Sequence, residues 1–404
     1  MSTVVDPVLS RSRFPIMPFG RLVRRSKEDG RPDLESLSVF LGQGVVPRSS
    51  RDDNHNRLGA DLCKYLVVRP DDLVFNKLRT WQGGFGRSRY EGIVSPAYFV
   101  CRPKPDVDSR YLHFLLLCAP YMAELTRVSK FMPPSQFDIM WDDLKLLPIP
   151  VPPLATQRAI ADYLDTETAR IDALIEKKRR MVELLESHLR SFISEATSDG
   201  PFVQIRRVTS MRTSGPRGWG DRVGDVGQPF IRSANLQRNG VTIRTDNLAY
   251  VDVPASPESQ RSTTREGDVL IGITGANTGW VGHVEAQLAG GFVSQHVAIL
   301  RPDSVNSKWL AYTIYSFRSQ DQLLGGQYGG TKQQLGLDDL ADLRVSAPSL
   351  QVQQERVKTL DMEWSKVERL LVWLGYQIDL LIEHRQAVIT AAVTGELTIP
   401  AVAA

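Results

Sequence analysis

Cysteine is scarce in this sequence: its 404 residues contain only Cys63, Cys101 and Cys118. Three distant cysteines fit neither a disulfide framework nor a zinc site, so we expect buried, reduced thiols and a cytoplasmic location. No apolar run reaches the roughly 18 residues that a membrane span needs. The first residues also lack the apolar core of a signal peptide. The composition therefore predicts a globular protein that does not associate with membranes.

Catalytic motifs are also missing. The chain has no Asn/Asp-Pro-Pro-Tyr/Phe tetrad for adenine methylation, no acidic metal-nuclease pattern, and neither the GxSxG nor the HExxH motif. The glycine-rich stretches 83–86 and 275–282 do not match a phosphate-binding loop or a dinucleotide fingerprint. We interpret both as turns between strands. The sequence predicts a chain that catalyses no reaction by itself and holds no cofactor or metal.

The net charge of +3 is unevenly distributed along the chain. Residues 1–150 carry a net charge of +5 and residues 201–350 a net charge of +2, whereas 151–200 and 351–404 carry −2 each. Positive charge concentrated in the two long blocks is weak evidence for a polyanionic partner.

The sequence contains an internal duplication with an offset of 196 residues. Residues 141–165 align with 337–361, and nine of the 25 positions are identical. The same offset aligns Asp72 with Asp268, and a three-residue slip further along aligns Arg102 with Arg301. The duplication predicts two long blocks of one fold, each followed by a shorter block.

The short blocks are predicted to be long helices. Residues 156–197 contain neither glycine nor proline, and their apolar residues recur with a heptad period. A helix of roughly 37 residues is about 55 Å long and cannot bury its apolar stripe alone. We expect the two copies to pack against each other as an antiparallel coiled coil. Its seam is predicted to contain Leu164, Ile171, Leu174, Met181, Leu185, Leu360, Val367, Leu370, Leu374 and Leu381.

The long blocks alternate strand-like and helix-like segments. Residues 92–100, 268–273 and 292–300 are typical of strands, and 108–128 and 307–324 of helices. The predicted fold class is α+β: two α/β domains, related by an internal pseudo-two-fold axis and separated by the two long antiparallel coiled-coil helices. The predicted boundaries are 1–150 and 201–346 for the domains, 151–200 for the first helix, and 347–404 for the second helix and tail.

The repeated Pro-x-Leu-x-x-Gln motif that opens each long helix, at Pro152 and Pro348, resembles the DNA-specificity subunit of type I restriction–modification systems. The run from Asp72 to Arg79 and the closing Ala391–Leu397 run look like the same family. The resemblance covers nearly the whole chain. The weakest match is 271–274, where Ile-Gly-Ile-Thr replaces the Phe-Asn-Lys-Leu of the first block.

The resemblance implies a role in host defence and DNA methylation. Each long block would be a target recognition domain that reads one half of a split sequence in double-stranded DNA. The helices would bind two methylation (modification) subunits, and restriction/translocase subunits would join them. The resemblance places S-adenosylmethionine, ATP and Mg in those partner subunits.

Recognition of duplex DNA requires cations for phosphates and Arg, Lys, Asn or Gln side chains for base edges. Candidates in the polar loops of the first domain are Lys77, Arg79, Gln82, Arg87, Arg89, Ser135 and Gln136. Candidates in the second domain are Arg232, Asn235, Gln237, Arg238, Asn277, Gln295, Tyr328, Lys332 and Gln333.

Two alternative functions stay open at this stage. A self-contained DNA-modifying enzyme would transfer methyl groups without partners. A coiled-coil scaffold or adaptor would have no role with DNA, and its long blocks would lack salt-dependent affinity for a duplex.

Overall fold

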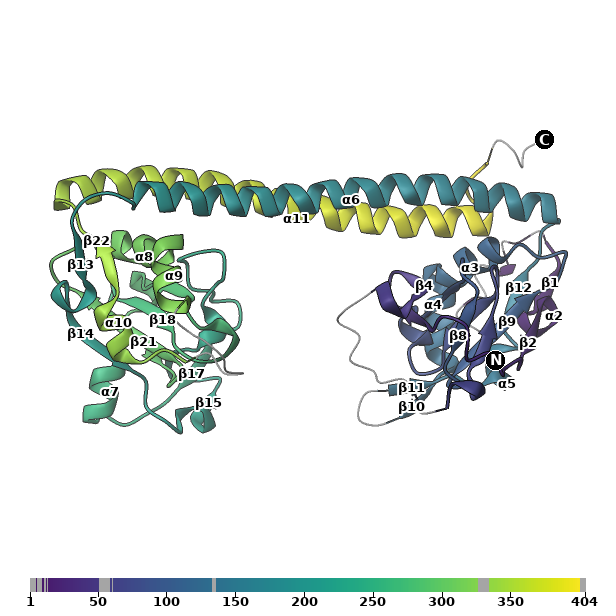
Figure 1. The fold of residues 1–404 in the computed structure, drawn as a ribbon, viewed down its shortest axis with the longest axis horizontal. Helices are drawn as coiled ribbons and strands as arrows, with labels where there is room; N and C mark the ends of the chain where they lie inside the picture. The colour runs from purple at the N-terminus through teal and green to yellow at the C-terminus, as the bar shows by residue number, and fades with distance from the viewer. Residues whose placement is uncertain are drawn as a thin grey trace. The chain divides into compact units, whose positions relative to one another are not determined.

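The structure, a computed structural model, describes residues 5, 9–10, 12, 14–50, 59, 61–132, 136–325 and 334–399. The chain packs into two compact units, Met1–Lys177 with Gln377–Ala404, and Lys178–Tyr376. Each unit contains one mixed α/β domain together with a segment of each long helix (Figure 1).

A four-stranded antiparallel sheet with the strand order β2-β9-β6-β7 organises the first domain. Its strands are β2 (Val23–Ser26), β9 (Tyr98–Pro103), β6 (Leu73–Asn76) and β7 (Phe85–Arg87). Small two-stranded sheets surround it: β1 (Ile16–Pro18) with β12 (Pro148–Pro150), β3 (Leu37–Phe40) with β4 (Gly44–Pro47), β5 (Leu66–Val68) with β8 (Gly92–Val94), and β10 (Lys130–Met132) with β11 (Gln136–Asp138). The helices of this domain are α2 (Phe19–Leu22), α3 (Ser109–Leu117), α4 (Ala119–Val128) and α5 (Trp141–Leu144).

The second domain repeats this sheet with the order β14-β21-β18-β19. Its strands are β14 (Thr209–Ser214), β21 (Val297–Pro302), β18 (Val269–Gly272) and β19 (Val281–His283). A second four-stranded sheet contains β15 (Val223–Gly224), β17 (Ala249–Val251), β16 (Gln228–Ile231) and β20 (Phe292–Val293), and β13 (Phe202–Gln204) pairs with β22 (Arg344–Ser346). The helices are α7 (Pro257–Ser262), α8 (Ser307–Tyr315), α9 (Phe317–Leu324) and α10 (Leu337–Asp342).

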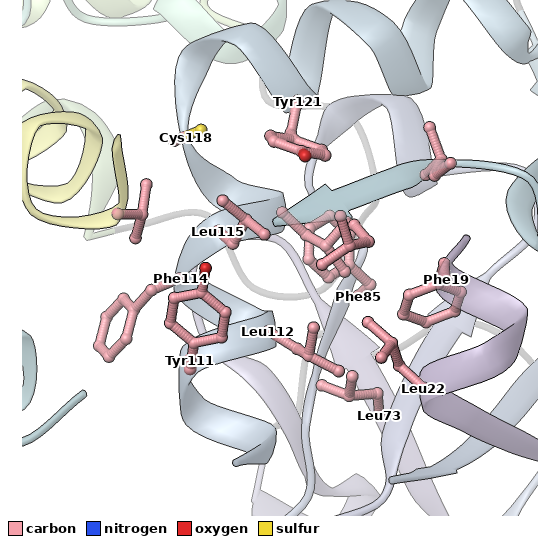
Figure 2. Packing of buried hydrophobic residues seen from close by; sticks show 14 of the residues in the cluster. Phe19, Leu22, Leu73, Phe85, Tyr111, Leu112, Phe114, Leu115, Cys118 and Tyr121 are labelled. Atoms are coloured by element: carbon pink, nitrogen blue, oxygen red, sulfur yellow. The ribbon is translucent and has the colours of Figure 1, made fainter. Parts of the chain in front are cut away.

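The core of the first domain lies between the sheet and helices α3 and α4. Tyr111, Leu112 and Leu115 of α3 contribute to one side of the buried cluster, and Phe19 and Leu73 contribute to the other (Figure 2). These five side chains are at most 1% exposed, and each large apolar side chain buried in this way contributes roughly 1.5–3 kcal/mol. The packing therefore fixes the sheet against the helices.

An acidic residue and an arginine aligned by the duplication form the same buried ion pair in both domains. The Arg102 Nε lies 3.2 Å from Asp72 Oδ1, and the Arg301 Nε lies 2.8 Å from Asp268 Oδ1. Both carboxylates are 1% exposed, and both also accept a backbone N–H three residues earlier in the chain. A buried carboxylate needs such partners, and the second domain preserves them.

The long helices are α6 (Leu154–Ala196) and α11 (Leu350–Thr394), and α6 begins two residues before the glycine- and proline-free stretch 156–197. In each unit their segments run side by side in opposite directions (Figure 1). In the second unit His188 contacts Glu363 at 3.5 Å, and the cation of Lys178 lies 5.5 Å from the ring of Trp373. In the first unit Arg385 pairs with Asp172 at 2.9 Å. These contacts confirm the antiparallel helix pair, and with the two mixed domains they confirm the α+β class.

Part of the predicted helix seam is wrong. Leu164, Ile171, Leu360, Val367 and Leu374 are at most 4% exposed, and Leu185 and Leu381 are half-buried. However, Leu174, Met181 and Leu370 are 40%, 50% and 39% exposed. The residue that follows is more buried in two of these cases: Ile175 is 6% exposed, and Leu371 is partly buried against the second core cluster. Leu174 and Ile175 are adjacent and both apolar, so the heptad pattern did not distinguish them.

Three further expectations need correction. Cys63 is exposed, whereas Cys101 and Cys118 are buried as expected. The strands expected at 92–100 and 292–300 are each two strands, β8 with β9 and β20 with β21, and the two members of each pair belong to different sheets. The helices expected at 108–128 and 307–324 break at Cys118 and Ser316, whose extended backbones start a second helix. Among the described residues, no helix has the length and hydropathy that crossing a membrane requires.

Candidate nucleic-acid interface

Polar loops gather at one edge of the central sheet in the first domain. Strands β6 and β9 are antiparallel neighbours, and Asn76 at the end of β6 opposes Tyr98 at the start of β9. The loop that follows β6 and the loop that precedes β9 therefore lie at the same edge. Lys77 and Arg79 belong to the first of these loops.

The hairpin of β10 and β11 lies against this edge. The backbone N–H of Ile139 donates to the carbonyl of Lys77 at 3.2 Å, and the rings of Trp81 and Phe137 lie 4.7 Å apart. The structure thus brings residues 77–81 together with residues 137–139, which follow the selected pair 135–136 in sequence. Ser135 lies outside the described residues, and only the backbone of Gln136 is described.

The edge is electropositive around a tyrosine. Burial raises the pKa of Tyr98, while the positive charges of Arg79 and Arg48 oppose that increase. Arg79 is exposed, and Lys77 is half-buried. A cationic surface on exposed loops is the electrostatic pattern that phosphate binding requires.

Arg87 and Arg89 occupy a different place. The Arg87 Nε lies 2.6 Å from Asp71 Oδ1, an oxygen that also accepts the Ser109 hydroxyl at 2.9 Å. Arg87, Arg89 and Gln82 line a cavity of about 570 Å³ together with residues of both long helices, including Asp172 and Arg385. The structure therefore places Arg87 and Arg89 beside the helices and separates them from the group around Lys77.

The second domain has polar loops at the equivalent edge of its sheet. Gly272 at the end of β18 opposes Val297 at the start of β21. The next residues meet: the Ile273 N–H donates to the His296 carbonyl at 2.9 Å, and the Thr274 hydroxyl contacts the His296 Nδ1. Gln295, which is exposed, lies 3.0 Å from the other ring nitrogen of His296 through its amide nitrogen.

A third segment reaches this edge through residues 334–335. The Leu335 N–H donates to the Ile273 carbonyl at 2.9 Å, and Gln334 forms a bridge with Thr274. Tyr328, Lys332 and Gln333 lie outside the described residues, immediately before this bridge in sequence.

Of the remaining candidates, Arg232 and Arg238 are exposed, and Asn277 is half-buried. The Asn277 side chain donates to the Ser233 carbonyl at 2.8 Å and joins two loops. Gln237, also half-buried, donates to the Thr242 carbonyl at 3.1 Å.

The structure corrects the prediction that the Asn235 side chain contacts DNA. It is 3% exposed, its side-chain oxygen accepts the Arg232 N–H, and its amide nitrogen donates to the Arg244 carbonyl. Asn235 therefore holds its own loop, and its side chain is not available to a base edge.

The sequence analysis missed Thr274, His296 and Gln334. They lie in three segments that are far apart in the chain and meet only after folding. Their positions gave a weak indication, because each residue is adjacent in sequence to a candidate, such as Gln295 or Gln333, or to the weakly matching run 271–274. Among the described residues, no group of three His, Cys, Asp or Glu side chains is arranged to hold a metal ion.

Residues 40–184 and 223–363 match the type I restriction modification DNA specificity domain. The two matched segments cover most of the chain and correspond to the two copies of the duplication. The chain belongs to the type I restriction–modification DNA specificity family.

The similar proteins agree with this family. The specificity subunit of type I restriction enzyme StySPI from Salmonella potsdam is 20% identical over 92% of this chain and 81% of that protein. The EcoBI specificity subunit from Escherichia coli is 22% identical over 62% of this chain, and the match spans 58% of that protein. One chain from a structural study of complex assembly and conformational transition of the type I R-M system has a TM-score of 0.72, with coverage of 95% of this chain and 98% of that one. At 18% identity, that likeness shows the fold alone.

Specificity subunits of this family are not enzymes, and this chain is accordingly a non-catalytic subunit associated with DNA recognition.

Proposed function

We propose that this specificity subunit reads a split target in double-stranded DNA and directs methylation and restriction subunits to it. In this proposal residues 1–150 and 201–346 are the two target recognition domains, and 151–200 and 347–404 are the spacer helices and tail. S-adenosylmethionine, ATP and Mg act in the partner subunits.

One observation carries the proposal. The same edge of the same four-stranded sheet bears exposed polar loops in both domains, at Lys77–Arg79 and at Thr274 with Gln295. The two edges differ in chemistry, since the first is rich in cations and the second in hydrogen-bonding amides and an imidazole. Two copies of one scaffold with different reading loops are suited to two different half-sites.

The long helices present an apolar surface that supports the partner part of the proposal. In the second unit Met181 and Leu184 of α6 are 50% and 60% exposed, and Trp373 and Tyr376 of α11 are 52% and 63% exposed. Large exposed apolar side chains of this kind typically mark protein–protein interfaces. We assign this surface to a methylation subunit.

The test is methylome sequencing of a host with and without this chain, with its methylation subunit present in both. A split adenine motif that disappears with the chain supports the proposal. Unchanged methylation, together with no salt-dependent affinity of the chain for a duplex, would favour the scaffold alternative instead.

A further inference from the structure

Two cations of the first domain rest on one aromatic ring at the candidate interface. The guanidinium carbon of Arg25, on β2, lies 4.7 Å from the centre of the Phe99 ring. The Lys77 ammonium lies 4.8 Å from the same centre. Trp141 of α5 completes the group, 5.9 Å from Phe99 and 5.6 Å from the Arg25 guanidinium carbon. Phe99 is only 3% exposed and belongs to the buried hydrophobic cluster of the domain, so the ring has a fixed position.

Neither cation has an acidic partner within the described part of the chain. Among the residues that the structure describes, Arg25 and Lys77 form no ion pair, whereas Arg87, Arg102 and Arg110 of the same domain all do. The positive charge of Arg25 acts on the carboxyl group of Asp142. Asp142, however, forms its ion pair with Lys145, at 2.5 Å. The hydrogen bond from Lys145 is the main cause that lowers the pKa of Asp142, and Arg25 adds a smaller effect.

A cation held over the face of an aromatic ring is suited to binding an anion. The face of an aromatic ring attracts the cation and restricts its rotamers, but it leaves the full positive charge in place. Much of the conformational entropy that a long side chain loses on binding is then already lost before the anion binds. A flexible surface lysine or arginine lacks this advantage.

The group adjoins the loops assigned to DNA. Lys77 is the first residue after β6, at the sheet edge described above, and its carbonyl accepts the N–H of Ile139. In a protein that binds duplex DNA, the anion at this edge is a backbone phosphate.

The strand positions of the second domain that the structure describes do not repeat this arrangement. From the strand registers, Arg212, Ala298 and Ile273 stand where the first domain has Arg25, Phe99 and Lys77. The Arg212 guanidinium donates to the carbonyl and hydroxyl of Thr209. At these equivalent positions the described part of the second domain therefore has one cation, already bonded, and no aromatic ring.

We propose that Arg25 and Lys77, held on Phe99, form a backbone-phosphate anchor in the first domain, and that the equivalent described positions of the second domain form none. This inference rests on the proposed function and adds a division of labour, in which the first domain contributes more of the sequence-independent affinity. Arg25 and Lys77 then act on affinity and its salt dependence without reading bases.

The experiment measures binding of the full chain to a fluorescent duplex of arbitrary sequence across a NaCl series. Each phosphate contact contributes about 0.9 to the slope of log K against log salt. Arg25→Gln and Lys77→Gln are each expected to reduce the slope by about 0.9, and the double variant by roughly twice that. Arg25→Lys keeps the charge and is expected to keep the wild-type slope.

Arg24→Gln is the matched control. Arg24 is the preceding residue of the same strand, is exposed, and projects from the opposite face of the sheet. Its variant is expected to keep the wild-type slope. If Arg25→Gln fails to fold, Lys77→Gln alone decides, since Lys77 lies in a loop.

The outcomes separate the two proposals. If the wild-type chain shows no salt-dependent binding, the proposed function fails and the anchor with it. If the wild-type chain binds but Arg25→Gln and Lys77→Gln keep its slope, only the anchor is overturned. An equal loss of slope in Arg24→Gln would also overturn it, because the ring would then be irrelevant.

Discussion

The side-chain oxygen of Gln157 accepts the backbone N–H of Asp108 at 2.9 Å, and so attaches the start of α6 to the start of α3. Gln353 repeats this bond in the second domain with the N–H of Asn306, at 2.8 Å. Each glutamine also donates to the carbonyl of the proline five residues earlier, at 2.8 Å and 2.7 Å. Both side chains are 1% exposed. The glutamine of the repeated Pro-x-Leu-x-x-Gln motif therefore fastens each domain to its own helix.

Replacing either glutamine is expected to loosen this attachment. Gln157→Ala or Gln353→Ala leaves buried backbone groups without partners, which costs about 1–3 kcal/mol for each group. Urea unfolding measures the loss. Gln351→Ala is the control, since Gln351 is exposed and bonds only to Glu355, and its effect is expected within about 0.5 kcal/mol. Equal stability of Gln353→Ala and Gln351→Ala would contradict this role.

The two buried ion pairs are expected to differ in strength. Asp268→Asn breaks contacts of 2.8 and 2.7 Å with Arg301, whereas Asp72→Asn breaks contacts of 3.2 and 3.3 Å with Arg102. Removing one partner of a buried pair costs about 3–5 kcal/mol, and we expect Asp268→Asn near the upper end. Thermal unfolding of both variants measures which one is less stable. A larger loss of stability in Asp72→Asn would show that these distances do not determine the strength of the two ion pairs.

His113 is expected to make stability depend on pH. Burial lowers the pKa of His113 to about 4, and its Nδ1 has no hydrogen-bond partner. Below its ordinary pKa of about 6.5 the unfolded chain binds the proton first, so the free energy of unfolding falls as the pH drops from about 6.5 to about 4. The full loss is about 3 kcal/mol.

His113→Phe is expected to remove most of that pH dependence, because the ring packs beside Phe85 and Phe114. Urea unfolding across this pH window measures it. His384→Gln, which changes an exposed histidine, serves as the control and is expected to keep the wild-type dependence. An unchanged pH profile in His113→Phe would show that other groups cause it.

His296 and Gln295 are expected to act on sequence preference in the second half-site. His296→Ala or Gln295→Ala removes a base-edge candidate, and each is expected to weaken cognate binding by about 1–3 kcal/mol with little change in the salt slope. Competition between cognate and arbitrary duplexes measures this. Equal weakening of binding to both duplexes would show that these residues contact the DNA backbone and not the base edges.

Trp373 is expected to matter for assembly. Trp373→Glu puts a charge on the exposed apolar surface of the helices and is expected to reduce co-purification with the methylation subunit at least tenfold, or about 1.4 kcal/mol. Lys358→Glu, on an exposed face of the same helix, is the control. If Trp373→Glu co-purifies with the methylation subunit as well as the wild-type chain does, this surface is not part of the partner interface.

The sequence alone determined the features that depend on local spacing or on the constant offset between two copies. The duplication, the two long helices, the alignments of Asp72 with Asp268 and of Arg102 with Arg301, and the motif glutamines could all be predicted, since each involves a period or a repeated residue. The contacts later seen between these residues follow from two copies that fold alike.

Only the tertiary structure decided which of two adjacent apolar residues is buried, and which cations are free. Ile175 rather than Leu174 is buried, and among the described residues Arg87 has an acidic partner whereas Arg25 has none. Thr274 contacts both His296 and Gln334, and the three residues come from three separate segments. Such outcomes depend on partners that arrive from distant parts of the chain, and neither periodicity nor composition records them.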